Sequence, residues 1–178
     1  MKGMKYMNRV IFVLGTVLVF LLVGCSSKPV ALAPVGPDPF GFASMASTGT
    51  LQVFSRQVER SDDLNQGADG LSDWRKHTGY DIYSPHGNLV RHVRNAPGYY
   101  SESPERISLP AGRYLVRAQA KGNFWVEVPV TIRQGRTTRV HLDDRWEPAR
   151  DVASTKIVTL PDGYAVGWRT EWANGNKP

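Results

Sequence analysis

The chain contains one cysteine, Cys25, and its position suggests a chemical role. A thiolate is a nucleophile, and a single thiol cannot close an intramolecular disulfide. Cys25 closely follows three basic residues and an uncharged run of 14 residues at 10–23. A membrane-spanning helix needs about 20 apolar residues, whereas the apolar part of an export signal needs about 7 to 15. The run therefore predicts an export signal that ends next to the cysteine.

The residues that close this segment are Leu22, Val23, Gly24 and Cys25. They resemble the lipobox of bacterial lipoproteins. The resemblance implies that residues 1–24 are a lipoprotein signal peptide, that cleavage precedes the cysteine, and that its sulfur receives a diacylglyceryl group. The freed amine is then acylated, for example with palmitate. Each buried CH₂ adds about 0.8 kcal/mol, so two or three chains would anchor the protein to a membrane. A plain signal peptide with an incidental cysteine is the alternative.

A polar loop carries oxygen-bearing side chains at alternate positions around a glycine. The spacing resembles calcium-binding loops of thrombospondin type 3 and EF-hand type, with Asn65, Asp69 and Asp73 at the first, fifth and ninth ligand positions. Gly67 replaces the third ligand, and Lys76 stands where the closing acid belongs. Because calcium takes about six or more oxygen ligands, the loop is predicted to hold no metal. A working calcium site is the alternative.

The sequence contains no recognisable catalytic constellation. The four histidines are dispersed, their spacing matches no zinc ligand set, and we expect them on exposed turns and strands. No nucleophile elbow, Ser-x-x-Lys motif or phosphate-binding glycine loop occurs. The adjacent acids at 62–63 and 143–144 point to opposite sides of an extended chain, which does not suit a glycosidase pair. We predict a non-enzymatic protein without a cofactor. A metal-dependent enzyme built on the polar loop is the alternative.

Aromatic side chains are the other candidates for binding. Trp125 lies opposite the apolar face of a predicted strand, and Tyr99 and Tyr100 are adjacent in a polar loop at 96–105. Exposed tryptophan and tyrosine can stack on sugar rings or anchor a protein interface. A carbohydrate- or peptidoglycan-binding surface predicts that these three residues line one open face. Because large aromatic residues in small sandwiches mostly fill space, we predict packing in the core or a hairpin, and the binding surface is the alternative.

The elements that must position these residues are short strands. The stretch 105–142 predicts a short strand, a Pro-Ala-Gly turn and three longer strands in a meander. Apolar and polar residues alternate along 112–120 and 124–132, which is typical of half-buried strands, and the pattern continues at 138–142. Three further elements are predicted, a strand at 50–58 and hairpins at 79–94 and 155–169.

Two motifs in this stretch resemble a known family. They are Ile-x-Leu-Pro-Ala-Gly-Arg-Tyr-x-Val at 107–116 and Gly-Arg-Thr-Thr-x-Val-x-Leu at 135–142. Both are similar to the carboxypeptidase regulatory-like and PEGA-type modules of bacterial envelope proteins. The resemblance covers about 50–143 and implies a non-catalytic domain with a transthyretin-like or immunoglobulin-like fold. We therefore predict an all-β protein with a single small antiparallel β-sandwich.

Composition divides the chain into four parts. The signal peptide at 1–24 is followed by Cys25 and a flexible tether that ends at residue 48. The tether is rich in proline and small residues, which favour extended chain and cannot bury a core. The β-sandwich is predicted at 49–144, and a C-terminal extension with a β-hairpin is predicted at 145–178.

The net charge of the chain indicates which classes of binding partner to expect. Residues 1–24 hold three of the 22 basic residues and none of the 16 acidic ones, so 19 and 16 remain and the net charge falls from +6 to +3. The remaining charges are scattered, which argues against nucleic-acid binding. Ser26 follows the cysteine, and by resemblance to lipoprotein sorting this implies the outer membrane of a Gram-negative cell. We predict an envelope lipoprotein, bound to the membrane by its lipid, whose domain binds or spaces an envelope protein or glycan.

Overall fold

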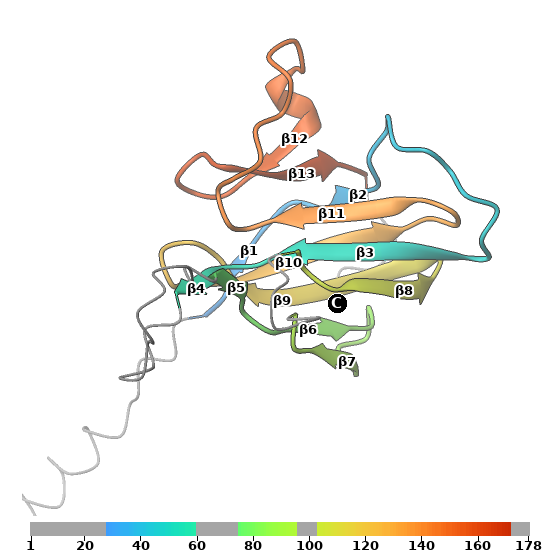
Figure 1. Cartoon of the computed structure of the whole chain (residues 1–178), viewed down its shortest axis with the longest axis horizontal. Helices are drawn as coiled ribbons and strands as arrows, with labels where there is room; N and C mark the ends of the chain where they lie inside the picture. Colours follow the sequence, from blue (N-terminus) through green and yellow to red (C-terminus); the bar gives the residue numbers. More distant parts are fainter. Residues whose placement is uncertain (1–27, 60–74, 96–102, 172–178) are drawn as a thin grey trace, which may run out of the picture.

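The protein is built from β-strands. The computed structural model describes residues 28–59, 75–95 and 103–171, and within these ranges the only helical element is a 3₁₀ turn, η1 (Ser154–Lys156). The strands form a large sheet, a three-stranded sheet and a two-stranded ribbon (Figure 1). The predicted all-β fold is confirmed.

The large sheet has eight strands, and β10 is its central element. β1 and β2 both pair with one edge of β10, and β9 pairs with the other. In spatial order the main path is β12 (Ile157–Thr159), β13 (Ala165–Arg169), β2 (Val35–Gly36), β10 (Trp125–Ile132), β9 (Gly112–Gln119), β6 (Tyr80–Tyr83) and β7 (Leu89–Val93), with β1 (Val30–Ala31) beside β10.

The small sheet lies in front of β9 and β10 in the view of Figure 1. Its order is β11 (Thr137–His141), β3 (Thr48–Phe54) and β8 (Arg106–Pro110). A separate antiparallel ribbon joins β4 (Gln57–Glu59) to β5 (Arg75–His77). Because both sheets contribute buried side chains to one core, the arrangement is sandwich-like.

The predicted meander at 105–142 is wrong. The Pro-Ala-Gly turn carries the chain from β8 in the small sheet to β9 in the large one, and the turn at 133–136 carries it back from β10 to β11. Only β9 and β10 are hydrogen-bonded neighbours in this stretch. Since each of the other turns changes sheet, β11 comes to lie beside β3 and runs parallel to it, with Thr138 opposite Leu51. The predicted antiparallel sandwich is therefore corrected to mixed sheets.

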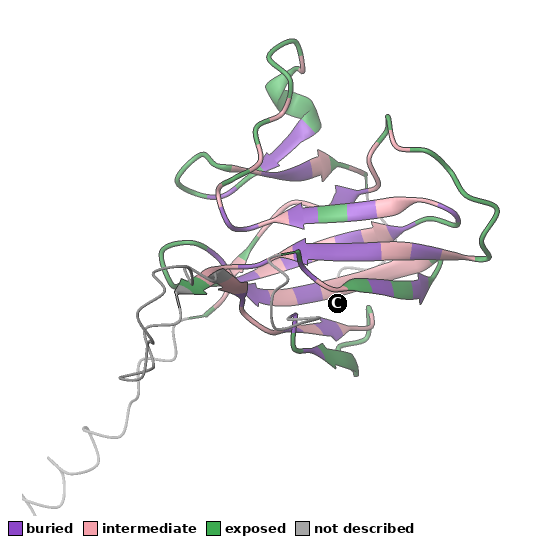
Figure 2. Ribbon diagram, viewed as in Figure 1, coloured by how far each residue is buried: buried purple, intermediate pink, exposed green. Residues whose placement is uncertain are grey.

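The alternation that the sequence showed is preserved in the core. Val126, Val128 and Val130 of β10 are fully buried, and the intervening positions are exposed or intermediate. Val53 and Val140 meet them from the small sheet in the same cluster. Figure 2 shows the resulting alternation of buried and partly exposed positions along the strands. Full burial of one such side chain contributes roughly 1.5–3 kcal/mol, so these positions dominate the stability of the domain.

The predicted tether at 25–48 is wrong for part of its length. Val30 pairs with Val126 and Val35 pairs with Val130, both in parallel with β10, and Val35 is completely buried. Pro129, which has no N–H to donate, falls between the stretches of β10 that β1 and β2 cover. The open edge of β10 offers backbone hydrogen bonds to any short extended segment, and a low average hydrophobicity does not prevent two valines from using it.

Both predicted hairpins are present. β6 and β7 pair with Tyr80 opposite Val93, and β12 and β13 pair with Ile157 opposite Trp168. The second hairpin extends the large sheet, because β13 pairs with β2. The predicted C-terminal extension therefore belongs to the same domain as the strands before it.

A buried asparagine ties the small sheet to the chain that follows β7. Asn95 Nδ2 donates to the carbonyl oxygen of Val53 at 2.8 Å and to Ser55 Oγ at 2.9 Å. Its Oδ1 accepts a hydrogen bond from the N–H of Glu105 at 3.0 Å. The backbone of Asn95 is left-handed, with φ of 57°, a conformation that asparagine tolerates better than most residues. One side chain thus fixes the positions of three segments.

Candidate functional site

Six aromatic rings form a continuous row along one side of the domain. We call this set the aromatic row. The neighbouring centroids are separated by 5.5 Å (Phe40–Trp168), 5.9 Å (Trp168–Trp146), 5.0 Å (Trp146–His141), 4.3 Å (His141–Phe54) and 5.8 Å (Phe54–His77). The rings come from segments that the sequence assigned to the tether, the sandwich and the C-terminal extension.

The middle of the row follows from strand geometry. Phe54 and His141 are opposite one another in the parallel register of β3 and β11, and both face away from the core because Val53 and Val140 face into it. Their rings stack with an interplanar angle of 14°, and Trp146 stacks on His141 at 17°. Each aromatic pair contributes about 0.5–1.5 kcal/mol beyond the area it buries. These contacts hold the chain after β11 against the outer face of the small sheet.

One end of the row borders a hollow of about 310 Å³, which we call the histidine hollow. Its lining includes His77, which is buried, and Gln57. His77 Nδ1 is 2.6 Å from the carbonyl oxygen of Ser55, so this nitrogen carries the proton and donates it. Nε2 lies 3.4 Å from Gln57 Nε2 and accepts from it. Both ring nitrogens are thereby committed within the domain.

Two further groups in the histidine hollow have altered pKa values. Burial lowers the pKa of His141 to about 4, and electrostatic interactions with Arg139 and His77 lower it further. Burial also raises the pKa of the Asp143 carboxyl, although His77 opposes this. Asp143 Oδ1 is buried and accepts no hydrogen bond from the residues that the structure describes. At neutral pH the hollow therefore presents an uncharged imidazole beside a carboxyl oxygen that lacks a donor.

The positions of the histidines differ from expectation. His86 and His92 are exposed, as predicted, whereas His77 is buried and His141 is half-buried. The fold brings the latter two together because β5 and β11 both approach the Phe54 end of β3. Across the described ranges, no three histidine, cysteine or acidic side chains are grouped so that they could hold a metal ion.

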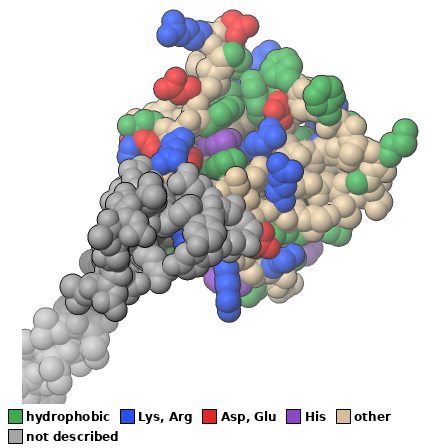
Figure 3. Space-filling model, in the orientation of Figure 1, with side chains coloured by type: hydrophobic (Ala, Val, Ile, Leu, Met, Phe, Trp, Pro, Cys, Tyr) green, Lys and Arg blue, Asp and Glu red, His purple; other side chains and the backbone are tan. Residues whose placement is uncertain are grey.

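The other end of the row borders a larger hollow of about 810 Å³, which we call the basic groove. It lies between the segment at 36–40, the turn at 133–136, η1 and β13. Figure 3 shows basic, acidic and hydrophobic side chains intermingled over the upper part of this view, where Figure 1 places β11, β12 and β13. Its charged and aromatic lining consists of Asp38, Phe40, Arg133, Arg136, Asp151, Lys156, Trp168 and Arg169.

One of the acids in the basic groove is already engaged. Asp38 Oδ2 lies 3.3 Å from Arg139 Nη1, and Oδ1 accepts the N–H of Phe40 at 2.9 Å. This second contact is a side-chain-to-backbone turn of the kind that aspartate often makes two residues before its donor. It projects Phe40 from the surface, where 79% of the residue is exposed. Asp38 thus orients the aromatic wall of the groove.

The basic side chains of the groove differ in whether they donate hydrogen bonds within the domain. Arg136 Nη1 donates to the carbonyl oxygen of Gly41 at 2.6 Å, and Arg169 Nη2 donates to that of Ile157 at 3.2 Å. The side chains of Arg133 and Lys156 are exposed and form no hydrogen bond or ion pair with any residue that the structure describes. Two positive charges therefore line the groove without a partner among the described residues.

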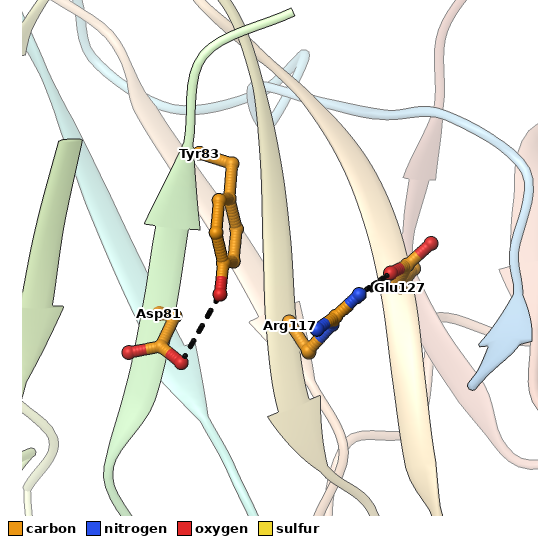
Figure 4. A network of polar contacts seen from close by, with 4 residues as sticks. All are labelled: Asp81, Tyr83, Arg117 and Glu127. Atoms are coloured by element: carbon orange, nitrogen blue, oxygen red, sulfur yellow. Dashed lines mark hydrogen bonds and ion pairs between the residues drawn. The ribbon is translucent and has the colours of Figure 1, made fainter. Parts of the chain in front are cut away.

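Trp125 does not belong to either hollow. It is 40% exposed at the beginning of β10, and it makes none of the ring contacts found among the described residues. The outer face of the large sheet beside it is polar and internally paired (Figure 4). Arg117 Nε donates to Glu127 Oε1 at 3.0 Å, and the Arg117 guanidinium lies 5.5 Å from the ring centroid of Tyr83. This face offers one exposed indole next to satisfied charges.

The remaining candidate residues lie outside the described ranges. They are the lipobox and lipidation residues Leu22, Val23, Gly24 and Cys25, the calcium-like residues Asn65, Asp69 and Asp73, and the tyrosines Tyr99 and Tyr100. The sequence-based expectations for them stay predictions.

The predicted binding face of Trp125, Tyr99 and Tyr100 does not include the three aromatic residues that border or bridge the hollows. Phe40, Trp146 and Trp168 lie outside the stretch that the family motifs cover. Phe40 and Trp146 lie in a Pro-rich and a polar segment that have no local strand pattern to bury a large ring, so each ring must find a partner elsewhere in the fold. A large aromatic residue in a segment without a strand pattern was therefore the sequence feature that could have indicated these contacts.

In the described part of the chain, no helix is long and apolar enough to cross a membrane. Comparison of the sequence and the structure with known families, curated proteins and solved structures found no match.

Proposed function

We propose that this protein is a lipid-anchored binding protein of the bacterial envelope, whose domain holds an envelope component without catalysing a reaction on it. The lipobox resemblance at 22–25 supports the anchor, and the motifs at 107–116 and 135–142 support an envelope module. The observation that carries the binding role is the basic groove, where Arg133 and Lys156 have no partner among the described residues. A domain that served only as a spacer would have no need of such a surface.

The strands near the N-terminus set the distance between the domain and its anchor. Cys25 precedes Val30, the first residue of β1, by five residues. An extended chain spans at most about 3.6 Å per residue, so a lipidated Cys25 would lie within about 18 Å of the start of β1. We infer a domain held close to the bilayer in place of the long stand-off that the predicted tether implied.

The same strands orient the groove. β1 pairs with the beginning of β10 and β2 pairs with its later part, so the chain runs along β10 from β1 toward β2. Strands rise about 3.3 Å per residue, which separates Val126 from Ile132 by about 20 Å. The groove follows β2 and the end of β10. On this proposal it opens at the end of the domain that lies farther from the anchor.

The test uses the full chain in a Gram-negative host. Wild type should incorporate radioactive palmitate and sediment with membranes, and Cys25→Ser should lose both properties. Crosslinking in intact cells should recover an envelope component with wild type, and recovery should fall with Arg133→Glu/Lys156→Glu. Palmitate labelling that survives Cys25→Ser would refute the anchor. Undiminished recovery with the double variant would refute the groove as the binding surface.

A further inference from the structure

We propose that the basic groove binds an acidic carbohydrate, that is, a sugar ring bearing carboxylate or phosphate groups. This inference rests on the proposed binding function and specifies its ligand. Four observations support it: the charge of the groove, the state of its backbone donors, its exposed aromatic wall and its place relative to β1.

The charges of the groove favour an anion. Arg133, Arg136, Lys156 and Arg169 line it together with two acids, and one of those acids, Asp38, is already paired with Arg139 outside the lining. Guanidinium groups bind carboxylate and phosphate through two parallel hydrogen bonds, and lysine adds a point charge. An anionic ligand would therefore gain partners here without displacing an existing ion pair.

The backbone of the groove argues against an extended peptide. Peptides that dock on β-domains commonly add a strand and bind through main-chain hydrogen bonds. Pro37 and Pro39 have no N–H, and the N–H of Asp38 already donates to the Thr137 carbonyl at 3.2 Å. The N–H of Thr170 on the opposite wall is likewise bonded within the domain, to the Pro34 carbonyl. A ligand in the groove would therefore be bound mainly by side chains.

The aromatic wall supplies the second feature of the ligand. Phe40 touches Trp168 edge-on, with an interplanar angle of 74°, so the contact does not stack the two rings on each other. Phe40 is also largely exposed. An exposed ring of this kind gains free energy by covering the C–H surface of a partner. A free inorganic anion has no such surface, whereas an acidic sugar presents both the apolar ring face and the charge.

The position of the groove distinguishes between two sources of an acidic sugar, a lipid headgroup and a polysaccharide. Phosphate-bearing sugars occur on lipids as well as in polymers, and a lipid headgroup would reach the domain from the bilayer. The groove lies beyond β2, at the end of β10 farther from β1, which is the first strand after Cys25 in the sequence. That end is accessible to a polymer in the envelope space. We therefore assign the ligand to a polysaccharide and treat the lipid headgroup as an outcome of the test.

The binding experiment uses the lipidated full chain in detergent micelles and measures affinity by calorimetry. The probes are soluble peptidoglycan glycan strands, neutral dextran, phosphatidylglycerol–phosphatidylcholine vesicles and inorganic phosphate. Wild type should bind the acidic strands at least tenfold more tightly than the other three. Arg133→Glu/Lys156→Glu should weaken this binding at least tenfold, and Phe40→Ala should weaken it about threefold. The matched control Arg94→Glu/Arg106→Glu, which makes the same charge change at exposed positions outside the groove, should change it less than twofold.

A second measurement needs no variant. Acidic strands should protect the Lys156 amine of wild type from acetylation and leave Lys28, which lies outside the groove, unprotected. Equal binding by the groove variant and its control, or absence of protection, would overturn the proposal. Tighter binding of the vesicles than of the strands would identify the ligand as a lipid headgroup. Equally tight binding of inorganic phosphate would show that recognition does not require a sugar ring. If in-cell crosslinking still depends on Arg133 and Lys156 in any of these cases, only the carbohydrate assignment fails.

Discussion

His141 illustrates how burial sets the charge of a single residue. Its imidazole lies between Phe54 and Trp146, and its pKa falls from 6.5 to about 4 mainly because the folded domain shields it from water. Arg139 and His77 act in the same direction. Asp143 nearby has a raised pKa and acts in the opposite direction on stability. The imidazole therefore serves as an uncharged aromatic ring in the row.

This assignment predicts a pH-dependent stability. Because unfolding raises the pKa of His141, its contribution is complete above pH 6.5 and is lost as the pH falls toward 4. The difference corresponds to roughly 3 kcal/mol of unfolding free energy at most, and the protonation of Asp143 offsets part of it. Urea unfolding at pH 7.5, 5.5 and 4 should show this loss in wild type and a smaller one in His141→Phe.

The control for this prediction is His86→Phe, which changes an exposed turn histidine. It should keep the pH dependence of wild type. If His141→Phe and wild type lose the same free energy between pH 7.5 and 4, the assignment of the effect to His141 is incorrect.

At the scale of one element, the turn between β10 and β11 anchors the segment that precedes β3. Gly135 is buried and has φ of 65°, a left-handed conformation that glycine adopts without cost. Its N–H donates to the Thr48 carbonyl at 2.9 Å, and its carbonyl accepts the N–H of Ser44 at 2.8 Å. A Cβ at this position would lie 1.9 Å from the Ser44 carbonyl oxygen. The turn and the segment before β3 therefore fit each other only with glycine.

Gly135→Ala should destabilise the domain by more than about 3 kcal/mol, since it combines a strained backbone with displacement of the Ser44 segment. Gly87→Ala is the matched control, because Gly87 also has positive φ but nothing lies within 4 Å of its added Cβ. Its cost should be about 1 kcal/mol. Thermal unfolding of the two variants measures the difference, and equal losses would show that the close approach at Gly135 does not matter.

For the whole molecule, β2 is the piece that joins the C-terminal hairpin to the large sheet. Val35 pairs with Val130 on one side and with Arg169 on the other, and its side chain is completely buried. The basic groove depends on the same junction, since its walls follow β2 and include β13. The two residues of β2 thus hold β10 and β13 together, and the partner residues Val130 and Arg169 lie 95 and 134 positions beyond Val35 in the sequence.

A charged side chain in β2 should disrupt its pairing with β10 and β13. Val35→Asp buries an unpaired carboxylate and should lower the unfolding free energy by more than about 3 kcal/mol, with loss of amide-exchange protection in β12 and β13. Val58→Asp, at a position that is 40% exposed, should cost less than about 1 kcal/mol. A tether would tolerate Val35→Asp, so an unchanged exchange pattern would restore the tether interpretation.

The sequence by itself determined the features that depend on neighbouring residues. Alternation along 124–132 records which side chains face the core, and the hairpins at 79–94 and 155–169 close through local turns. The export signal and the lipobox at 22–25 are also local patterns, and they stay predictions.

Only the tertiary structure decided which sheet each strand joins and which side chains meet. β2 has two residues, too few to show any period, and the open edge of β10 gives it a place. His141 and Phe54 stack because β11 lies parallel to β3, a pairing between segments that no turn connects. The basic groove likewise joins segments from 36 to 170. Backbone pairing and ring packing across such separations depend on where the whole chain has space and unpaired hydrogen-bonding groups, which no local pattern records.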